Sequence, residues 1–330
     1  MTYAAAAAAH PNIAFIKYWG NRDPSLRLPA NGSISMTLGA LETRTRVVFD
    51  RDLKKDQLTI NGSSARGAGL ERVSTFLDRV RKMAGMTLRA RVVSRNTFPM
   101  GSGIASSASA FAALSLAASA ACDLSLSEDE LSRLARTGSG SASRSVPGGF
   151  VEWRAGSGHE DSYAVSIAPP GHWDLVDHVV IVSKEHKETG STAGHQLAET
   201  SPLQQARVAD APRRLELCRR AIQERDFAAF SKVVEQDSNM MHAVMMTSQP
   251  QLLYWRPETL RVMRAVRSWR QDGLSACCTV DAGPNVHVLC PGEQAGEIEG
   301  RLRKLPGIKE VLTSPPGGGV KLLTPPGDKV

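Results

Sequence analysis

The sequence predicts an α+β protein built from two lobes. Strand-like and helix-like patterns are mixed in both halves of the 330 residues. With 42% hydrophobic and 22% charged residues, the composition is that of a globular chain that buries a core. The length corresponds to about two domains. Because the character of the chain changes after Lys184, we expect an N-terminal lobe at residues 1–185 and a C-terminal lobe at 186–330.

Apolar periodicity and turn signals place the elements of the first half. Apolar residues recur at helical spacing over 68–83, which predicts an amphipathic helix. The helix expected over 105–121 consists of unusually small residues, so it must pack closely against a neighbour. Ser127 and Glu130 form a capping box that begins the next helix. Two neighbouring strands joined by a charged turn are expected at 45–50 and 57–60, and further strands at 88–94 and 179–182.

The second half combines long helices with two late strands. Helical stretches are expected at 201–225, 227–246 and 257–271, and strands at 276–281 and 286–289, on either side of a sharp Asp-Ala-Gly-Pro break. An Ala run at 4–9 and a Pro/Gly stretch at 315–319 are the low-complexity patches.

Net charge points to an anionic partner. The chain carries +7 at neutral pH, with a pI near 9.3. Its basic residues are scattered and only 5% of residues are aromatic, which argues against a nucleic-acid surface. A small phosphorylated substrate fits the charge at least as well.

Cysteine usage and the N-terminus indicate the compartment. The five cysteines are odd in number and lack C-x-x-C spacing, which argues against a disulfide framework or a zinc site. The Ala-rich start lacks a basic segment and is a poor signal peptide. No segment approaches the ~20 apolar residues of a membrane span. We therefore expect a cytoplasmic protein that does not bind a membrane.

The most informative chemistry lies in residues 99–108, which read Pro-Met-Gly-Ser-Gly-Ile-Ala-Ser-Ser-Ala. Glycines let backbone N–H groups crowd around an anion, and the following helix N-terminus favours negative charge. Hydroxyls of Ser106 or Ser107 could reach phosphate oxygens or Mg²⁺. A flexible linker before a buried Ala-rich helix is the alternative interpretation. The segment is neither a Walker A loop nor a dinucleotide fingerprint.

Read as a whole, this segment resembles the ATP-binding motif of the GHMP kinase superfamily. Three further segments resemble its mevalonate diphosphate decarboxylase branch: Asn-Ile-Ala-Phe-Ile-Lys-Tyr-Trp-Gly at 12–20, Ser-Gly-Ser-Ala-Ser-Arg-Ser at 139–145 and Asp-Ala-Gly-Pro-Asn at 281–285. Stretches at 28–35, 96–99 and 237–243 follow the same order. The resemblance implies the GHMP fold, with an N-terminal lobe like ribosomal protein S5 domain 2, a ferredoxin-like C-terminal lobe, and ATP and substrate in the cleft between them.

The resemblance also implies an ATP-dependent carboxy-lyase. The family phosphorylates the C3 hydroxyl of its substrate, expels phosphate and releases CO₂. Asp281 occupies the position of the catalytic carboxylate, Lys17 that of the neighbouring cation, and Arg144 that of the guanidinium that grips the substrate carboxylate.

Each of these three residues has a plainer interpretation. Asp281 could be an Asx-turn residue before Gly-Pro. Arg144 could lie in a solvated turn. Lys17 could extend its ammonium to solvent, but it lies in an otherwise apolar strand, where an unpaired ammonium is costly to bury, so a functional role is favoured.

The implied ligand contacts divide between the substrate and the nucleotide. The substrate contacts are Tyr18, Trp19, Gly20, Asn21, Arg72, Ser139, Gly140, Ser141, Ser191 and Thr192. For Arg72, a solvated helix face remains the alternative. The ATP contacts are Asn96, Met100, Gly101, Ser102, Gly103, Ala105, Ser106 and Ser107, with Ser106 or Ser107 as the candidate Mg²⁺ ligand.

Position 21 departs from the family pattern. The family has a lysine that contacts the substrate diphosphate where this chain has Asn21. The segment at 190–195 also lacks the arginine that some bacterial members carry after its serine. Because a diphosphate carries more negative charge than a monophosphate, we hypothesise a preference for mevalonate 5-phosphate, which would yield isopentenyl phosphate.

Other interpretations remain open at the level of the sequence. The lost contacts could be replaced by His186, Lys187 or His195, which lie in a stretch expected to be a mobile loop. Mevalonate 5-diphosphate would then be the substrate. A mevalonate kinase without decarboxylation and a non-catalytic binding module are further alternatives. The expected partners are the small-molecule substrate and ATP, and a homodimer is kept open.

Overall fold

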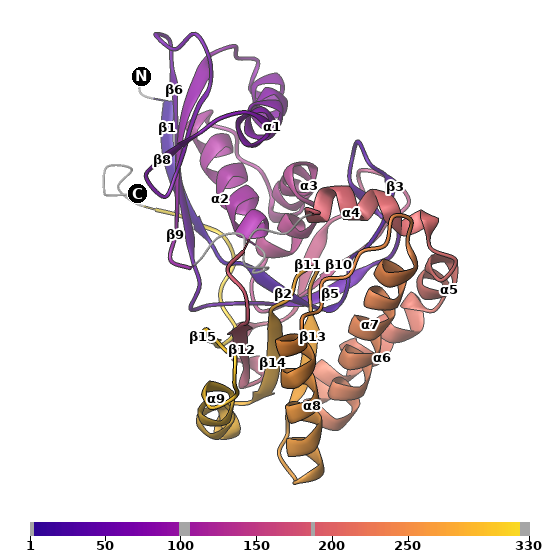
Figure 1. Cartoon of the computed structure of the whole chain (residues 1–330). Coiled ribbons are helices and arrows are strands. Elements are labelled where there is room, and N and C mark those ends of the chain that lie inside the picture. The colour runs from indigo at the N-terminus through magenta and orange to yellow at the C-terminus, as the bar shows by residue number, and fades with distance from the viewer. Residues whose placement is uncertain (1–2, 99–105, 186–188, 324–330) are drawn as a thin grey trace.

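The N-terminal lobe is built on a six-stranded sheet with the order β16-β1-β6-β9-β7-β8. The structure is a computed structural model and describes residues 3–98, 106–185 and 189–323. Helices α1 and α2 lie against one face of this sheet (Figure 1). The strands are β1 (Tyr3–Ala9), β6 (Thr43–Asp50), β7 (Gln57–Ile60), β8 (Ser63–Ala65), β9 (Arg89–Asn96) and β16 (Lys321–Leu322), and the helices are α1 (Ala68–Ala84), α2 (Ser106–Ala121) and α3 (Glu128–Gly138).

Small side chains bring strand β1 and helix α2 close together. The Ala run at 4–9 forms most of β1, between β16 and β6. Its Ala7 and Ala9 share one apolar core with Ala113 and Ala117 of α2. The expectation that the small-residue helix packs closely is therefore confirmed. The sequence did not predict β1, because alanine has little preference for strands.

Two four-stranded sheets make up most of the rest of the molecule. The first has the order β11-β10-β5-β2 and the second β13-β14-β12-β15. Their facing sides share one apolar core with α6 and α7, in which Phe15, Phe150 and Phe230 are buried. The strands are β2 (Asn12–Ile16), β5 (Ser33–Thr37), β10 (Phe150–Trp153), β11 (Ala164–Ala168), β12 (Leu175–Ile181), β13 (Cys277–Val280), β14 (Val286–Pro291) and β15 (Glu310–Ser314).

Helices and a hairpin complete the fold. A second core lies between the sheet that contains β14 and helices α8 and α9. The small hairpin of β3 (Asn21–Asp23) and β4 (Leu28–Pro29) follows β2 directly. The remaining helices are α4 (Ser191–Leu197), α5 (Gln204–Ala209), α6 (Ala211–Glu224), α7 (Phe227–Thr247), α8 (Pro257–Gln271) and α9 (Ala295–Arg303), with 3₁₀ turns that include η1 (Gly140–Ser145). No helix in the described ranges is long and apolar enough to cross a membrane.

Most predicted elements are present, with three corrections. Strand β9 lies between β6 and β7, so these two strands are not direct neighbours. The helical stretch expected at 201–225 is divided into α5 and α6 near Asp210, before a proline. Residues 191–197 form a helix where a mobile loop was expected, while 186–188 lie outside the described residues.

The sheets do not follow the predicted division at residue 185 strictly. Strand β12 pairs with β14 and β15 of the C-terminal half, although it precedes that residue. The end of the chain returns to the first sheet, where β16 pairs with β1. A division at residue 185 therefore separates β12 and β16 from the sheets to which they belong. The position of the domain boundary stays a prediction.

Candidate active site

A buried ion pair connects the N-terminal and C-terminal halves of the chain. The Nζ atom of Lys17 lies 2.5 Å from Oδ1 of Asp281. The Lys17 side chain is 2% exposed, whereas that of Asp281 is 25% exposed. The carboxylate is therefore open on one side, and the ammonium supports it from within the protein.

The backbone of Lys17 is held by charged side chains. Its N–H donates to Oδ2 of Asp237 at 2.6 Å, and its carbonyl accepts from Nη2 of Arg207 at 2.7 Å. Asp237 is itself paired with Arg214, at 2.7 Å, and all three of these side chains are buried. This network fixes where the chain leaves β2 and therefore where the Lys17 side chain starts.

Helix α7 positions the backbone that precedes Asp281. The N–H of Val280 donates to Oγ of Ser238 at 3.0 Å, and the Val280 carbonyl lies 3.1 Å from Nε2 of His242. Burial lowers the pKa of His242 to about 4, although its contact with the Val280 carbonyl opposes this effect. The imidazole is therefore neutral at physiological pH and donates to the carbonyl.

Electrostatics keep Asp281 ionised. Burial alone would raise the pKa of this carboxyl, but the charge of Lys17, followed by those of His287 and Arg144, lowers it below its usual value. A carboxylate with a depressed pKa remains a hydrogen-bond acceptor over the physiological range. Such a group can accept or orient the proton of a hydroxyl.

Arg144 lies in η1 and is almost completely buried without a carboxylate partner in the described part of the chain. Its Nη1 donates to Oγ of Ser33 at 2.5 Å, and its Nε donates to Oδ1 of Asn12 at 3.2 Å. Burial lowers its pKa to about 10, while Asp281 opposes this change. A buried guanidinium held by neutral groups is suited to a carboxylate ligand. We call Lys17, Arg144 and Asp281 the reaction centre.

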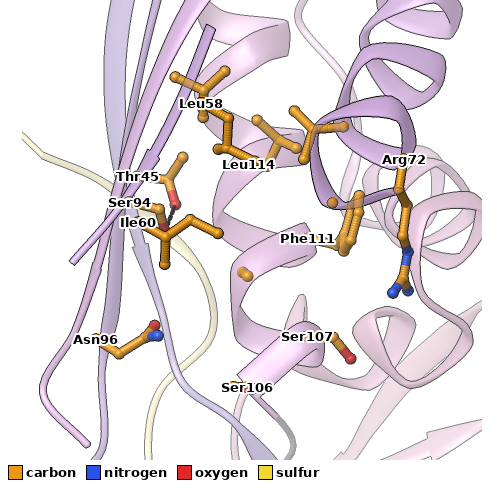
Figure 2. A pocket seen from close by; sticks show the side chains of 14 residues that line it. Thr45, Leu58, Ile60, Arg72, Ser94, Asn96, Ser106, Ser107, Phe111 and Leu114 are labelled. Carbon is orange, nitrogen blue, oxygen red and sulfur yellow. Dashed lines mark hydrogen bonds between the residues drawn. The ribbon is translucent and has the colours of Figure 1, made fainter. Parts of the chain in front are cut away.

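A second site lies between the first sheet and helices α1 and α2. Figure 2 shows apolar side chains such as Leu58 and Ile60 at one end, and Asn96, Ser106 and Ser107 at the other. An apolar pocket next to a helix N-terminus suits a nucleotide, with the base among apolar groups and the phosphates at the helix. Three predicted ATP contacts therefore line one pocket. The predicted contacts Met100, Gly101, Ser102, Gly103 and Ala105 lie outside the described residues.

The nucleotide pocket meets the predicted substrate loop at residues 138 and 139. The hydroxyls of Ser107 and Ser139 lie 3.2 Å apart. Arg72 lines the same pocket, and its Nε and Nη2 donate to the Gly138 carbonyl at 3.0 and 2.7 Å. Burial, followed by the charge of Arg27, lowers the pKa of Arg72 to about 10. The solvated-face interpretation of Arg72 is therefore wrong.

The residues predicted to hold the substrate tail are only partly brought together. Tyr18 donates its hydroxyl to Oδ1 of Asn21 and lies against Gly140, where a Cβ atom would be 2.6 Å from the Tyr18 oxygen. Burial raises the pKa of Tyr18 to about 12, so the phenol stays protonated. Ser191 and Thr192, in contrast, are exposed at the start of α4.

His195 of α4 packs against the Tyr-Trp-Gly segment. Its ring stacks on Tyr18 with centroids 4.1 Å apart, and its Nδ1 accepts from the Gly20 N–H at 3.0 Å. Burial, followed by the charge of Arg27, lowers its pKa to about 3. His195 is therefore neutral and adds no cation in place of the family lysine.

Several residues of this region were not predicted from the sequence. Arg207 and Arg214 occupy one face of the α5–α6 region, seven residues apart, which could have signalled a shared polar partner. Arg27 lies in the loop of the β3–β4 hairpin, and no sequence pattern indicates its role. Its charge lowers the pKa values of Tyr18, Arg72 and His195, although burial has the larger effect on each.

Comparison with known proteins decides the family. Residues 9–164 match the diphosphomevalonate decarboxylase-like N-terminal domain, and residues 178–314 match the mevalonate 5-diphosphate decarboxylase C-terminal domain. The diphosphomevalonate decarboxylase of Candida albicans is 39% identical over 94% of this chain and 92% of its own length. The chain belongs to the diphosphomevalonate decarboxylase family. The human diphosphomevalonate decarboxylase is 35% identical over 89% of this chain and 78% of its own length.

Solved structures of this family have the same fold. Mevalonate diphosphate decarboxylase from Staphylococcus aureus superposes with a TM-score of 0.93 at 38% identity, covering 98% of both chains. A complex of MDDEF with MVAPP, AMPPCP and magnesium has a TM-score of 0.93 at 35% identity, covering 98% of this chain and 99% of the other. The predicted GHMP fold, the ATP-dependent enzyme class, and ATP and Mg²⁺ as cofactors are confirmed.

The described residues fit a nucleotide that brings its own magnesium. They contain no group of three or more His, Cys, Asp or Glu side chains that could hold a metal ion by themselves. Mg²⁺ commonly binds through substrate phosphates, water and one or two protein oxygens, and the hydroxyls of Ser106 and Ser107 line the pocket. When bound, the ion would neutralise phosphate charge.

Proposed function

We propose that this chain catalyses the ATP-dependent decarboxylation of mevalonate 5-diphosphate to isopentenyl diphosphate, CO₂, ADP and phosphate. The observation that carries the proposal is the Lys17–Asp281 pair, whose carboxylate is the exposed partner. The names of the relatives support the diphosphate, which the sequence analysis kept as its alternative.

The reaction centre assigns one role to each of its side chains. Asp281 accepts or orients the C3 hydroxyl proton of the substrate, because its depressed pKa keeps it ionised. Lys17 keeps that carboxylate charged and stabilises negative charge that develops during phosphoryl transfer. Arg144 binds the substrate carboxylate, which must be held until it departs as CO₂.

The junction of the two sites explains how the reactants meet. Ser107 begins the helix at the nucleotide pocket, and Ser139 begins the substrate loop. Their contact supports a bound nucleotide whose phosphate end lies beside the substrate loop, from where the γ-phosphoryl group can approach the C3 hydroxyl. Proximity of this kind is a large part of phosphoryl-transfer catalysis.

A second candidate is the decarboxylation of mevalonate 5-phosphate, which the sequence analysis favoured. The comparisons do not support it, but one observation favours it: Asn21 and the neutral His195 add no positive charge beside Tyr18. A smaller anion would need fewer cations.

Steady-state kinetics with both substrates test the proposal. We expect a higher kcat/KM for mevalonate 5-diphosphate than for mevalonate 5-phosphate, measured as ADP release with ATP and Mg²⁺. A higher value for the monophosphate would overturn the proposed substrate and support the second candidate. A cytoplasmic location and a homodimer stay predictions.

A further inference from the structure

The substrate tail needs positive charge that residue 21 does not supply. Asn21 accepts a hydrogen bond from the Tyr18 hydroxyl and is neutral. A phosphorylated tail is a multiply charged anion at neutral pH. This inference rests on the proposed function, because that function implies such a tail. Another cation near Tyr18 must therefore supply the charge.

Arg27 lies on the same hairpin as Asn21, six residues further along the chain. Its backbone is left-handed, with φ at 50°, a conformation that costs a non-glycine residue stability and is maintained by its surroundings. Two arginines outside the hairpin hold its loop: Arg79 donates to the Ser25 carbonyl at 3.3 Å, and Arg136 donates to the Leu26 carbonyl at 3.1 Å. The loop is thereby fixed against α1 and α3.

The guanidinium groups of Arg27 and Arg72 bind two consecutive main-chain carbonyls at the end of α3. Arg27 donates through Nε to the carbonyl of Thr137 at 3.1 Å, and Arg72 donates to the carbonyl of the next residue, Gly138. Neither arginine forms an ion pair with a carboxylate in the ranges that the structure describes. Two neighbouring, partly buried cations without a counter-ion repel each other, so they favour an anion between or beside them.

We infer that Arg27 is a specificity-determining residue for the phosphorylated tail of the substrate, acting with Arg72 in place of a cation at residue 21. The two arginines, together with Tyr18, Asn21 and His195, form what we call the tail cluster. Tyr18 contributes a neutral hydroxyl, and a planar guanidinium presents paired N–H donors that match a phosphate.

A structural role for Arg27 is the competing explanation. Its Nε satisfies a carbonyl at the end of α3, which stabilises a helix terminus. In the described part of the chain, however, this bond uses only Nε, so the two Nη groups remain available to a ligand. A role limited to the helix end would affect thermal stability and leave the KM for substrate unchanged.

The test compares Arg27→Gln with a matched control, Arg22→Gln. Arg22 lies on the same hairpin, is exposed, and donates to the Ala155 carbonyl at 2.9 Å. Both variants remove one positive charge from the hairpin. The assay uses whichever mevalonate phosphate the wild type turns over with the higher kcat/KM, and it measures KM for that substrate, KM for ATP, and Tm.

We expect Arg27→Gln to raise KM for the mevalonate phosphate about tenfold or more, with KM for ATP within twofold of wild type. Arg22→Gln should change both constants less than twofold. Adding Asn21→Lys to Arg27→Gln should recover most of the loss, because a cation returns to the same hairpin. A substrate KM for Arg27→Gln within twofold of wild type would overturn the inference.

The proposed function can fail independently of this inference. If the wild type releases no CO₂ from either mevalonate phosphate, the proposed function is wrong. If the wild type is active and Arg27→Gln binds substrate normally, only the role of Arg27 is wrong.

Discussion

The reaction centre and the tail cluster lie at the two ends of one short segment, residues 17–21, yet they balance charge in different ways. In the reaction centre, Lys17 is paired with Asp281, and its backbone is fixed by a second buried ion pair. In the tail cluster, Arg27 and Arg72 face neutral groups and main-chain carbonyls. The Lys17–Asp281 pair is complete before substrate arrives, whereas the two arginines of the tail cluster need an anion to neutralise them.

This contrast divides chemistry from recognition. A preformed ion pair keeps one carboxylate in a fixed charge state, which proton transfer requires. Arginines without a counter-ion lower the stability of the free protein but increase its affinity for a negatively charged ligand. Substitutions of Lys17 or Asp281 should therefore change kcat, and substitutions in the tail cluster should change KM and substrate preference.

The largest effect is expected for Asp281→Asn. An amide cannot accept the hydroxyl proton, so we expect kcat to fall about 10³-fold, within the usual range for loss of a general base. Asp272→Asn, at an exposed carboxylate of the same lobe, is the control and should leave kcat unchanged. Equal kcat values for Asp281→Asn and wild type would remove Asp281 from the mechanism.

The next effect is on stability and concerns the support of Lys17. Asp237→Asn removes one of the two carboxylates that pair with the buried Arg214, which keeps Asp210, and weakens the bond to the Lys17 N–H. Losing the fully buried partner of this charged group costs about 2 kcal/mol or more. Chemical denaturation at neutral pH measures the loss, with exposed Asp52→Asn as the control. A variant as stable as wild type would show that this network does not support the reaction centre.

A smaller effect is expected in the tail cluster from Asn21→Lys. The new ammonium would lie beside the Tyr18 hydroxyl, which now donates to Asn21. We expect the ratio of kcat/KM for the diphosphate over the monophosphate to rise about tenfold, or about 1.4 kcal/mol. Asn21→Gln, which keeps the residue neutral, should leave the ratio within twofold of wild type. A ratio unchanged by the lysine would show that this position does not contact the tail.

The effect that is smallest at neutral pH is the contribution of His242 to stability, which develops only as the pH falls. Its folded-state pKa of about 4 lies below the ordinary value of 6.5. Below pH 6.5 the unfolded chain therefore binds a proton that the folded chain does not, so stability is present above pH 6.5 and declines as pH falls toward 4. Between pH 7.5 and 5.0 this one group should lower the free energy of unfolding by about 2 kcal/mol.

His242→Gln isolates that contribution. Glutamine can donate to the Val280 carbonyl but does not titrate, so the variant should lose about 2 kcal/mol less than wild type over the same pH interval. Urea denaturation at the two pH values gives the comparison. Identical pH dependence in both proteins would show that His242 is not buried as a neutral group.

The reaction centre could be predicted from the sequence to a greater extent than the tail cluster. Lys17, Arg144 and Asp281 belong to contiguous segments whose residue types suit one reaction. Arg27 carries no such signal, because its position depends on a left-handed backbone and on the end of a helix 110 residues away. The exposure of Ser191 and Thr192, at the start of a short helix, could not be predicted from the sequence either.

The fold shows the same division between local and long-range information. Helix α1 and the capping box before α3 follow from local periodicity and were predicted. The insertion of β9 between β6 and β7 depends on pairing between distant segments, which local patterns do not specify. The alanines of β1 are in a strand because α2 packs closely against them.

The most direct test of the account is the ratio of CO₂ to ADP. With carboxyl-labelled mevalonate 5-diphosphate, ATP and Mg²⁺, the wild-type chain should release one labelled CO₂ for each ADP formed. ADP formation with the label retained in a phosphorylated acid would contradict the account and identify a kinase that does not decarboxylate.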